Sequence, residues 1–208
     1  MVKLLFLLSV LCVPCCFLKA QSPWELKKDK DNIRIYSRSV SGCKFNELKA
    51  VFDVTGSLSQ LQAVLSDVNN YKDWVYSTEF TKLLESRSDT EMIYYSRISA
   101  PWPASNRDFY SDTHIRMDQA NQRLFISSHN IDNKPLSDHL VRVPYLRAEW
   151  AITVPAPNVV HVEYTLAWNP GGSVAGWIAN MFSTTGPYQT FSELKRKMNV
   201  ISSAVSER

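Results

Sequence analysis

Two aspartates and a histidine at even spacing are the residues most able to bind a metal ion. Asp108, Asp112 and His114 fall in a segment of alternating hydrophobicity, so in a strand all three would face the same side. Arg116 shares that side, and at strand rise Asp108 and His114 would lie roughly 20 Å apart. A solvated sheet face explains these residues better than a metal site, and we expect neither a metal nor another cofactor.

Cys43 is the other candidate for covalent chemistry. It lies between Gly42 and Lys44, in a segment typical of a turn, and no histidine has an evident reason to approach it. The chain also lacks the G-x-S-x-G elbow, the P-loop, G-x-G-x-x-G and H-E-x-x-H, the local signatures of hydrolases, nucleotide-binding enzymes and zinc proteases. The commonest local signatures of these enzymes are therefore absent, and the motifs leave the function open.

Residues 1–20 have the pattern of a secretory signal peptide. A lysine precedes an apolar stretch of about 15 residues, fewer than the roughly 20 that a membrane-spanning helix needs. We expect cleavage after Ala20 and a secreted or periplasmic mature protein. A lipid anchor on Cys15 or Cys16 and an uncleaved, buried N-terminal helix are the alternatives.

Removal of this segment changes the charge of the protein. The whole chain has 23 Lys and Arg against 20 Asp and Glu, a net charge of +3. Loss of Lys3 and Lys19 leaves 21 against 20, a net charge of +1. This balance gives no reason to expect nucleic acid as a partner. Cys43 becomes the only cysteine, which excludes an internal disulfide.

The remaining residues, 21–208, contain no repeat or linker and predict a single domain. Apolar residues at helical spacing behind Ser57 predict a helix over about 58–68. The same spacing predicts a long C-terminal helix over about 174–201, with a kink near Gly186-Pro187.

Alternating hydrophobic and polar residues predict eight strands. These strands are expected near 33–40, 45–54, 79–87, 91–99, 107–118, 122–131, 140–154 and 158–168. Short connections indicate one large antiparallel sheet, which must curl, so the fold class is α+β. Curled around the C-terminal helix, the sheet would enclose a packed core or a cavity. Small residues at inward positions, namely Ser96, Ser111 and Ala148, favour some empty volume.

Four groups of short strings stand out along the chain. They are Tyr71-Lys72-Asp73-Trp74; Ala100-Pro101-Trp102-Pro103 with Ser105-Asn106-Arg107-Asp108-Phe109; Val141-Arg142-Val143; and Asn169-Pro170-Gly171-Gly172 leading to Trp177-Ile178-Ala179-Asn180. In this order and spacing they resemble the START (StAR-related lipid-transfer) family, with phosphatidylcholine-transfer-protein-like members nearest, from about Trp24 to Met198. The resemblance implies a helix-grip fold, in which a curved antiparallel sheet wraps a long C-terminal helix around one lipid. It also implies lipid transfer without catalysis, with that helix and the loop over 130–138 as a gate.

The resemblance places the ligand between the sheet and the C-terminal helix. With the inward-facing sets it predicts a ligand-binding wall of Ser96, Ile98, Phe109, Thr113, Leu146, Ala148, Trp168, Trp177, Met181 and Phe182, with Arg142 as the polar contact. The family's choline-caging positions correspond to Ser96, Phe109 and Leu146, which include only one aromatic residue, so choline is not predicted. The family's phosphate contacts correspond to Lys72 and Val75. Lys72 or Arg142 could still meet an anionic or hydroxyl head group.

Two other functions remain open. A cyclase- or hydrolase-like enzyme on the same scaffold would need an acid or base in the cavity, and the inward sets contain almost no titratable group besides Arg142 and Tyr164. An interaction module would have a closed cavity. We predict instead a monomeric carrier that binds one lipid and contacts membrane surfaces transiently.

Overall fold

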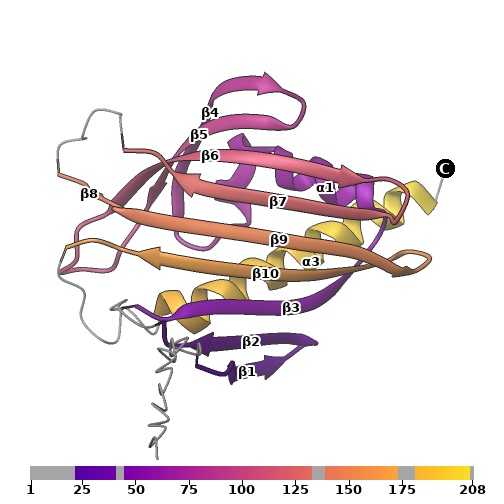
Figure 1. Cartoon of the computed structure of the whole chain (residues 1–208), viewed down its shortest axis with the longest axis horizontal. Helices are drawn as coiled ribbons and strands as arrows, with labels where there is room; N and C mark the ends of the chain where they lie inside the picture. Colours follow the sequence, from indigo (N-terminus) through magenta and orange to yellow (C-terminus); the bar gives the residue numbers. More distant parts are fainter. Residues whose placement is uncertain (1–21, 41–44, 133–138, 173–180, 207–208) are drawn as a thin grey trace, which may run out of the picture.

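The computed structural model describes residues 22–40, 45–132, 139–172 and 181–206. Within these ranges the chain forms a ten-stranded sheet and two α-helices, α1 and α3 (Figure 1), which confirms the α+β helix-grip fold. None of the helices in the described ranges is both long enough and apolar enough to cross a membrane. The predicted signal peptide, Cys43 and Trp177 lie outside the described residues.

The ten strands follow one another around the sheet in the order β1-β2-β3-β10-β9-β7-β6-β5-β4, with β8 beside β6. Their bounds are β1 Glu25–Lys30, β2 Ile33–Arg38, β3 Glu47–Thr55, β4 Thr78–Ser88, β5 Glu91–Ile98, β6 Arg107–Asp118, β7 Arg123–Asn130, β8 Val141–Arg142, β9 Tyr145–Ala156 and β10 Val159–Asn169. Every pairing is antiparallel except the short one between β6 and β8. The strands predicted between 79 and 131 match β4, β5, β6 and β7 closely.

Two strand predictions need correction. The single strand expected over 140–154 is broken into β8 and β9 at Pro144, which has no N–H to donate to a neighbouring strand. The N-terminal strand β1 was not predicted, because its sequence ELKKDK shows no alternation. As an edge strand it is exposed on both faces, so no hydrophobic pattern marks it.

Helix α1, Leu58–Ser66, begins as predicted at Ser57. The Ser57 hydroxyl accepts a hydrogen bond from the backbone N–H of Gln60, and the Gln60 side chain accepts one from the N–H of Ser57. A 3-10 helix, Val68–Asp73, follows where the sequence predicted the helix to stop. The helix therefore delivers Tyr71 and Trp74, which follow in the chain, to the interior.

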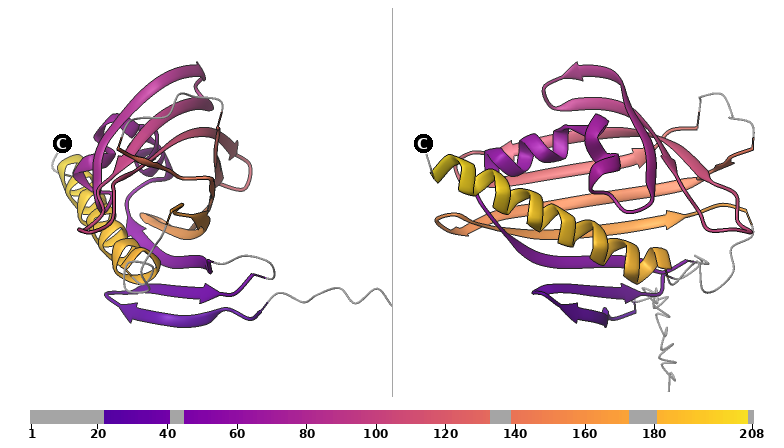
Figure 2. Two further views of the ribbon diagram at one scale, coloured as in Figure 1. Left: turned by 90° about the vertical axis from the view of Figure 1, so that its left-hand side faces the viewer. Right: turned by 180° about the vertical axis from the view of Figure 1, so that it is seen from behind.

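The C-terminal helix α3, Gly186–Ser206, lies across the concave side of the curled sheet (Figure 2). A π-helical turn, Met181–Thr185, precedes it, so the irregularity predicted near Gly186-Pro187 is present. Phe191, Leu194 and Met198 on the inner face of α3 are almost fully buried. The rings of Phe191 and Phe52 lie 4.6 Å apart, which ties the helix to β3.

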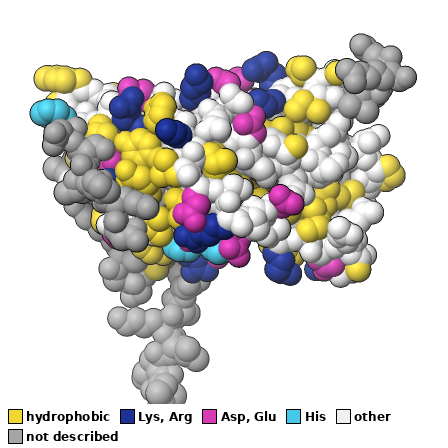
Figure 3. All heavy atoms as spheres, turned by 90° about the horizontal axis from the view of Figure 1, so that it is seen from above, with side chains coloured by type: hydrophobic (Ala, Val, Ile, Leu, Met, Phe, Trp, Pro, Cys, Tyr) yellow, Lys and Arg dark blue, Asp and Glu magenta, His cyan; other side chains and the backbone are white. Residues whose placement is uncertain are grey.

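The two faces of the sheet differ as the alternation predicts. On β6 the odd-numbered residues from Phe109 to Ile115 are buried, whereas Asp112, His114 and Arg116 on the other face are partly or fully exposed. Asp108 is the exception, since it is only 1% exposed. On the face seen from above, acidic and basic side chains are interspersed with hydrophobic areas (Figure 3), so this surface has a field of mixed sign.

Candidate functional site

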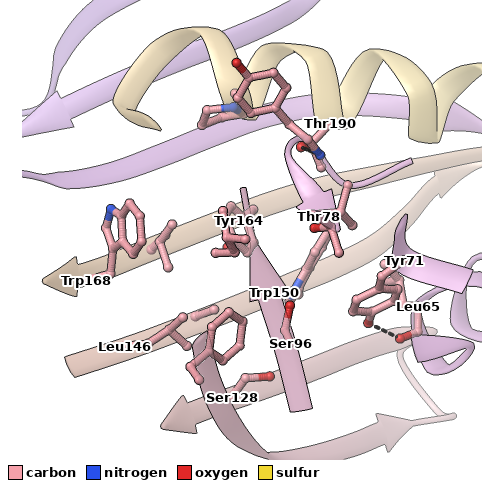
Figure 4. Close-up of a pocket in the computed structure, with 18 of the residues that line it drawn as sticks. Leu65, Tyr71, Thr78, Ser96, Ser128, Leu146, Trp150, Tyr164, Trp168 and Thr190 are labelled. Carbon is pink, nitrogen blue, oxygen red and sulfur yellow. Dashed lines mark hydrogen bonds between the residues drawn. The ribbon is translucent and has the colours of Figure 1, made fainter. Parts of the chain in front are cut away.

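A cavity of about 190 Å³ lies between the concave face of the sheet and the start of α3 (Figure 4). Strands β5, β6, β7, β9 and β10 supply most of its wall, and the 3-10 helix and α3 complete it. Aromatic and aliphatic side chains form most of this lining. Among the described residues that line it, none carries a charge at neutral pH.

Seven of the predicted wall residues line this cavity. They are Ser96, Ile98, Phe109, Thr113, Leu146, Ala148 and Trp168. Met181 and Phe182 belong to the π-helical turn, but their side chains, like all of Trp177, lie outside the description. Contact between any of these residues and a ligand remains a prediction.

Arg142 is not among the described residues that line the cavity. Its Nε donates to Asp108 Oδ1 at 2.8 Å and its Nη2 to Asp108 Oδ2 at 3.0 Å, a bidentate ion pair that is 11% exposed on the arginine side. The hydrogen bond to Asp108 is the largest cause that raises the pKa of Arg142. The guanidinium thus holds β8 against β6, and its contact with the ligand stays a prediction.

The candidate metal ligands lie on the outer face of β6 and are engaged with other side chains. Asp112 accepts from Arg87 Nη1 at 3.2 Å, and His114 Nε2 lies 3.3 Å from Asp112 Oδ1. The Asp108 carboxylate forms the ion pair with Arg142. No group of three His, Cys, Asp or Glu residues suited to a metal ion occurs in the described part of the chain.

Several lining residues were absent from the predicted wall. Tyr94, Ser128 and Trp150 each alternate in register with inward residues of their own strands, so the strand pattern could have included them. Tyr71 lies in the 3-10 helix and Trp74 follows directly at its C-terminal end, where no simple period indicates which side chains face inward. The rings of Tyr71 and Tyr94 lie 5.8 Å apart, edge to face.

Hydroxyl groups gather on one side of the cavity. Thr113 and Ser128 share a hydrogen bond of 2.8 Å between β6 and β7, and Ser111 lies 3.4 Å from Thr113. The Ser111 side chain also lowers the pKa of Tyr94, which partly offsets the rise caused by burial. The other side is aromatic, because Trp150, Tyr164 and Phe191 contact one another with ring centroids 4.6 to 5.9 Å apart.

The titratable groups of the described lining are all tyrosines. Desolvation raises the pKa of Tyr164 and Tyr94 above the ordinary value, and it raises the pKa of Tyr71 well above it. All three phenols therefore stay neutral at physiological pH. No described lining residue is a carboxylate, histidine, lysine or arginine that could act as an acid or base.

The start of α3, which covers the cavity, is attached on two sides. The Thr190 hydroxyl accepts the backbone N–H of Tyr76 at 3.0 Å, from the segment before β4. The Tyr188 hydroxyl donates to Asp31 in the β1–β2 turn, and the Lys28 ammonium lies 3.9 Å from the centroid of the Tyr188 ring. A ligand that enters beneath this part of α3 must loosen these contacts.

Comparison with known proteins gives a consistent result. An uncharacterized protein of Pseudomonas aeruginosa is 29% identical over 174 residues, which cover 83% of this chain and 85% of that protein. The phosphatidylcholine transfer protein of Mus musculus is 27% identical over 171 residues, 78% of each chain. The crystal structure of a STAR-related lipid transfer protein fragment from Xanthomonas axonopodis has a TM-score of 0.77 and 29% identity, covering 85% of this chain and 98% of that one.

The family profile agrees with the fold. The START domain profile matches residues 18–200, which include every strand and most of α3. The chain belongs to the START domain family.

Proposed function

We propose that this protein binds one lipid or similar apolar molecule in the cavity beneath α3 and carries it through water without chemical change. The observation that supports this most is the lining itself, which is apolar and aromatic with a few hydroxyl groups and no charged side chain among the described residues. Such a wall suits an acyl chain or a ring system, because each unpaired polar atom there would cost about 1 to 3 kcal/mol.

The volume of the cavity determines how the ligand must enter. Ligand pockets for molecules of moderate size usually measure roughly 300 to 1,000 Å³, and the cavity has about 190 Å³. Binding a whole lipid therefore requires the cavity to widen, and an outward movement of the start of α3 would provide the space. Loss of the Thr190 and Tyr188 contacts would accompany that movement.

A bulky side chain placed in the wall tests the site. Ala148 on β9 is 8% exposed and lines the cavity, so Ala148→Trp should fill much of the space and abolish uptake of lipid from mixed liposomes. Ala151 on the same strand is exposed, and Ala151→Trp serves as the matched control. Uptake is measured by native mass spectrometry as an adduct of the re-isolated protein. Undiminished uptake by Ala148→Trp would show that the ligand lies elsewhere.

The rival function is catalysis on the same scaffold. Aromatic cyclisation or hydrolysis needs a group that exchanges protons within reach of the ligand, and the titratable groups of the described lining are all tyrosines. Burial raises the pKa of three of them, Tyr71, Tyr94 and Tyr164. A carrier returns its ligand unaltered. Recovery of a ligand whose mass changes on incubation with the purified protein would favour the enzyme.

We also propose that the mature protein is exported and meets membranes briefly. The N-terminal signal pattern supports export, and an intact mass corresponding to a chain that begins at Gln21 would establish it. Trp102, in the loop between β5 and β6, is 90% exposed. Its exposure supports a role at a membrane surface, because indole rings favour the interfacial region.

A further inference from the structure

The β1–β2 hairpin forms the edge of the sheet that lies beside the start of α3 (Figure 2). Its turn consists of Asp31 and Asn32, because Lys30 and Ile33 are paired across the two strands. Both turn residues have positive φ values, 54° and 57°. This is the conformation of a type I′ turn, whose twist matches that of the strands it joins. Aspartate and asparagine tolerate it better than most residues, so the sequence favours a tight turn that presents Asp31 to α3.

The turn is attached to α3 at Tyr188, near the beginning of the helix. The Tyr188 hydroxyl donates to the Asp31 carboxylate, and the Lys195 ammonium, two turns further along α3, donates to the Asp31 carbonyl at 3.1 Å. The ammonium groups of Lys28 and Lys30 lie 3.9 and 5.6 Å from the centroid of the Tyr188 ring. A hydrogen bond to a carboxylate is stronger than one between neutral groups, and cations are attracted to the face of an aromatic ring. The hairpin therefore holds α3 through several complementary groups.

The first turn of α3 has little other support. Gly186, Pro187 and Thr190 line the cavity of about 190 Å³. Tyr188 and Gln189 line a second hollow, of about 430 Å³, which lies between α3, the 3-10 helix and the β1–β2 turn. Empty volume beside a helix removes the packing contacts that would otherwise hold it in place. The next turns differ, because their inward side chains are almost fully buried. The first turn of α3 therefore depends on its point contacts with neighbouring segments.

We propose that the β1–β2 hairpin is a strap that holds the first turn of α3 closed over the cavity and sets how often this turn opens. The bond between Tyr188 and Asp31 is its main attachment, because a carboxylate accepts it, whereas the bond between Thr190 and the Tyr76 N–H joins neutral groups. The inference rests on the proposed function for one consequence only, that opening admits a lipid. Opening itself is measured without lipid, so the two can fail separately.

Hydrogen exchange of the full chain tests the strap directly. Tyr188→Phe removes the hydroxyl but keeps the ring, and Asp31→Gly removes the carboxylate at a position whose positive φ suits glycine. Each variant should raise the exchange rate of the backbone amides of residues 186–192 by about five-fold, the effect of one hydrogen bond. The amides of residues 194–200 should exchange at the wild-type rate, because the inner face of this part of α3 is anchored in the core.

Two further substitutions separate the strap from general effects. Tyr145→Phe removes the hydroxyl of a half-exposed tyrosine on β9, and Asn32→Gly changes the other position of the turn. Both should leave the exchange of residues 186–192 unchanged. The double variant Tyr188→Phe with Asp31→Gly should exchange no faster than either single variant, because both changes remove the same bond. Wild-type exchange in the two single variants, or additive effects in the double variant, would overturn the strap.

The rate of lipid uptake shows whether the strap controls entry to the cavity. Mixed liposomes of phosphatidylcholine, phosphatidylglycerol and diacylglycerol are the donor, and adduct formation is followed by native mass spectrometry. Tyr188→Phe should take up lipid about five-fold faster than wild type, and Tyr145→Phe at the wild-type rate. Faster hydrogen exchange without faster uptake would overturn the control of entry by the strap. If even the wild type takes up no lipid while both single variants exchange faster, the strap is supported and the proposed function is wrong.

Discussion

Replacement of Arg142 by methionine tests whether this residue supports the fold or the ligand. The substitution keeps much of the apolar stem but leaves the Asp108 carboxylate, which is 1% exposed, without its two hydrogen bonds of 2.8 and 3.0 Å. One weaker contact remains, from the Tyr95 hydroxyl at 3.4 Å. Breaking a buried pair by removal of one partner costs about 3 to 5 kcal/mol. We expect Arg142→Met to lower the free energy of unfolding by about 3 kcal/mol.

Urea unfolding followed by tryptophan fluorescence measures this change. With a slope of about 2 kcal/mol/M, the midpoint should fall by about 1.5 M. The double variant Asp108→Leu with Arg142→Met removes both charges and should recover most of the loss, because the cost arises from the unpaired carboxylate. Lipid uptake by folded Arg142→Met at low temperature should equal that of wild type. A variant with unchanged stability but no uptake would refute this reasoning and return Arg142 to the ligand.

Two further predictions concern the buried tyrosines and the exposed tryptophan. Burial raises the pKa of Tyr71, Tyr94 and Tyr164 above their unfolded value, so stability is complete below pH 10 and falls as the pH rises further, by about 1.4 kcal/mol per tyrosine per pH unit. Urea midpoints from pH 9 to 11 measure this slope, which Tyr164→Phe should reduce by about a third; a flat profile would contradict the burial. Trp102→Ser should weaken co-sedimentation with phosphatidylcholine vesicles several-fold, whereas Leu26→Ser, half-exposed on β1, should not; equal loss for both would exclude a specific role for Trp102.

The strand pattern predicted the wall of the cavity because burial and alternation depend on the same geometry. Successive side chains of a strand point to opposite faces, so the placement of Phe109 on the inner face also places Thr113 there. Ser96 and Ala148 follow by the same rule on β5 and β9. The pattern could not predict that a cavity remains between these inward-facing side chains, because the volume of the cavity depends on how the curled sheet packs against α3.

The role of Arg142 could not be predicted from alternation. Its partner Asp108 lies 34 residues earlier, and the two residues are paired where the short strand β8 runs parallel to β6. An outward position on an ordinary strand would leave the carboxylate in water. Here β8 covers it, and the N–H of Val143 donates to the backbone carbonyl of Asp108 at 2.9 Å. Only the tertiary arrangement shows that an aspartate at an outward position is buried.

Neighbouring residues of β6 face opposite sides of the sheet, so variants on the two sides test different properties of the protein. Asp108 faces away from the cavity and Phe109 faces into it, although they are adjacent in the chain. A change at Asp108 or Arg142 is therefore expected to alter stability without altering the described lining of the cavity. A change at Ser96 or Ala148 alters that lining with little effect on the ion pair. If uptake and stability nevertheless changed together in both sets, the ion pair and the cavity wall would form one cooperative unit, and the opening of the cavity would involve β8 as well as α3.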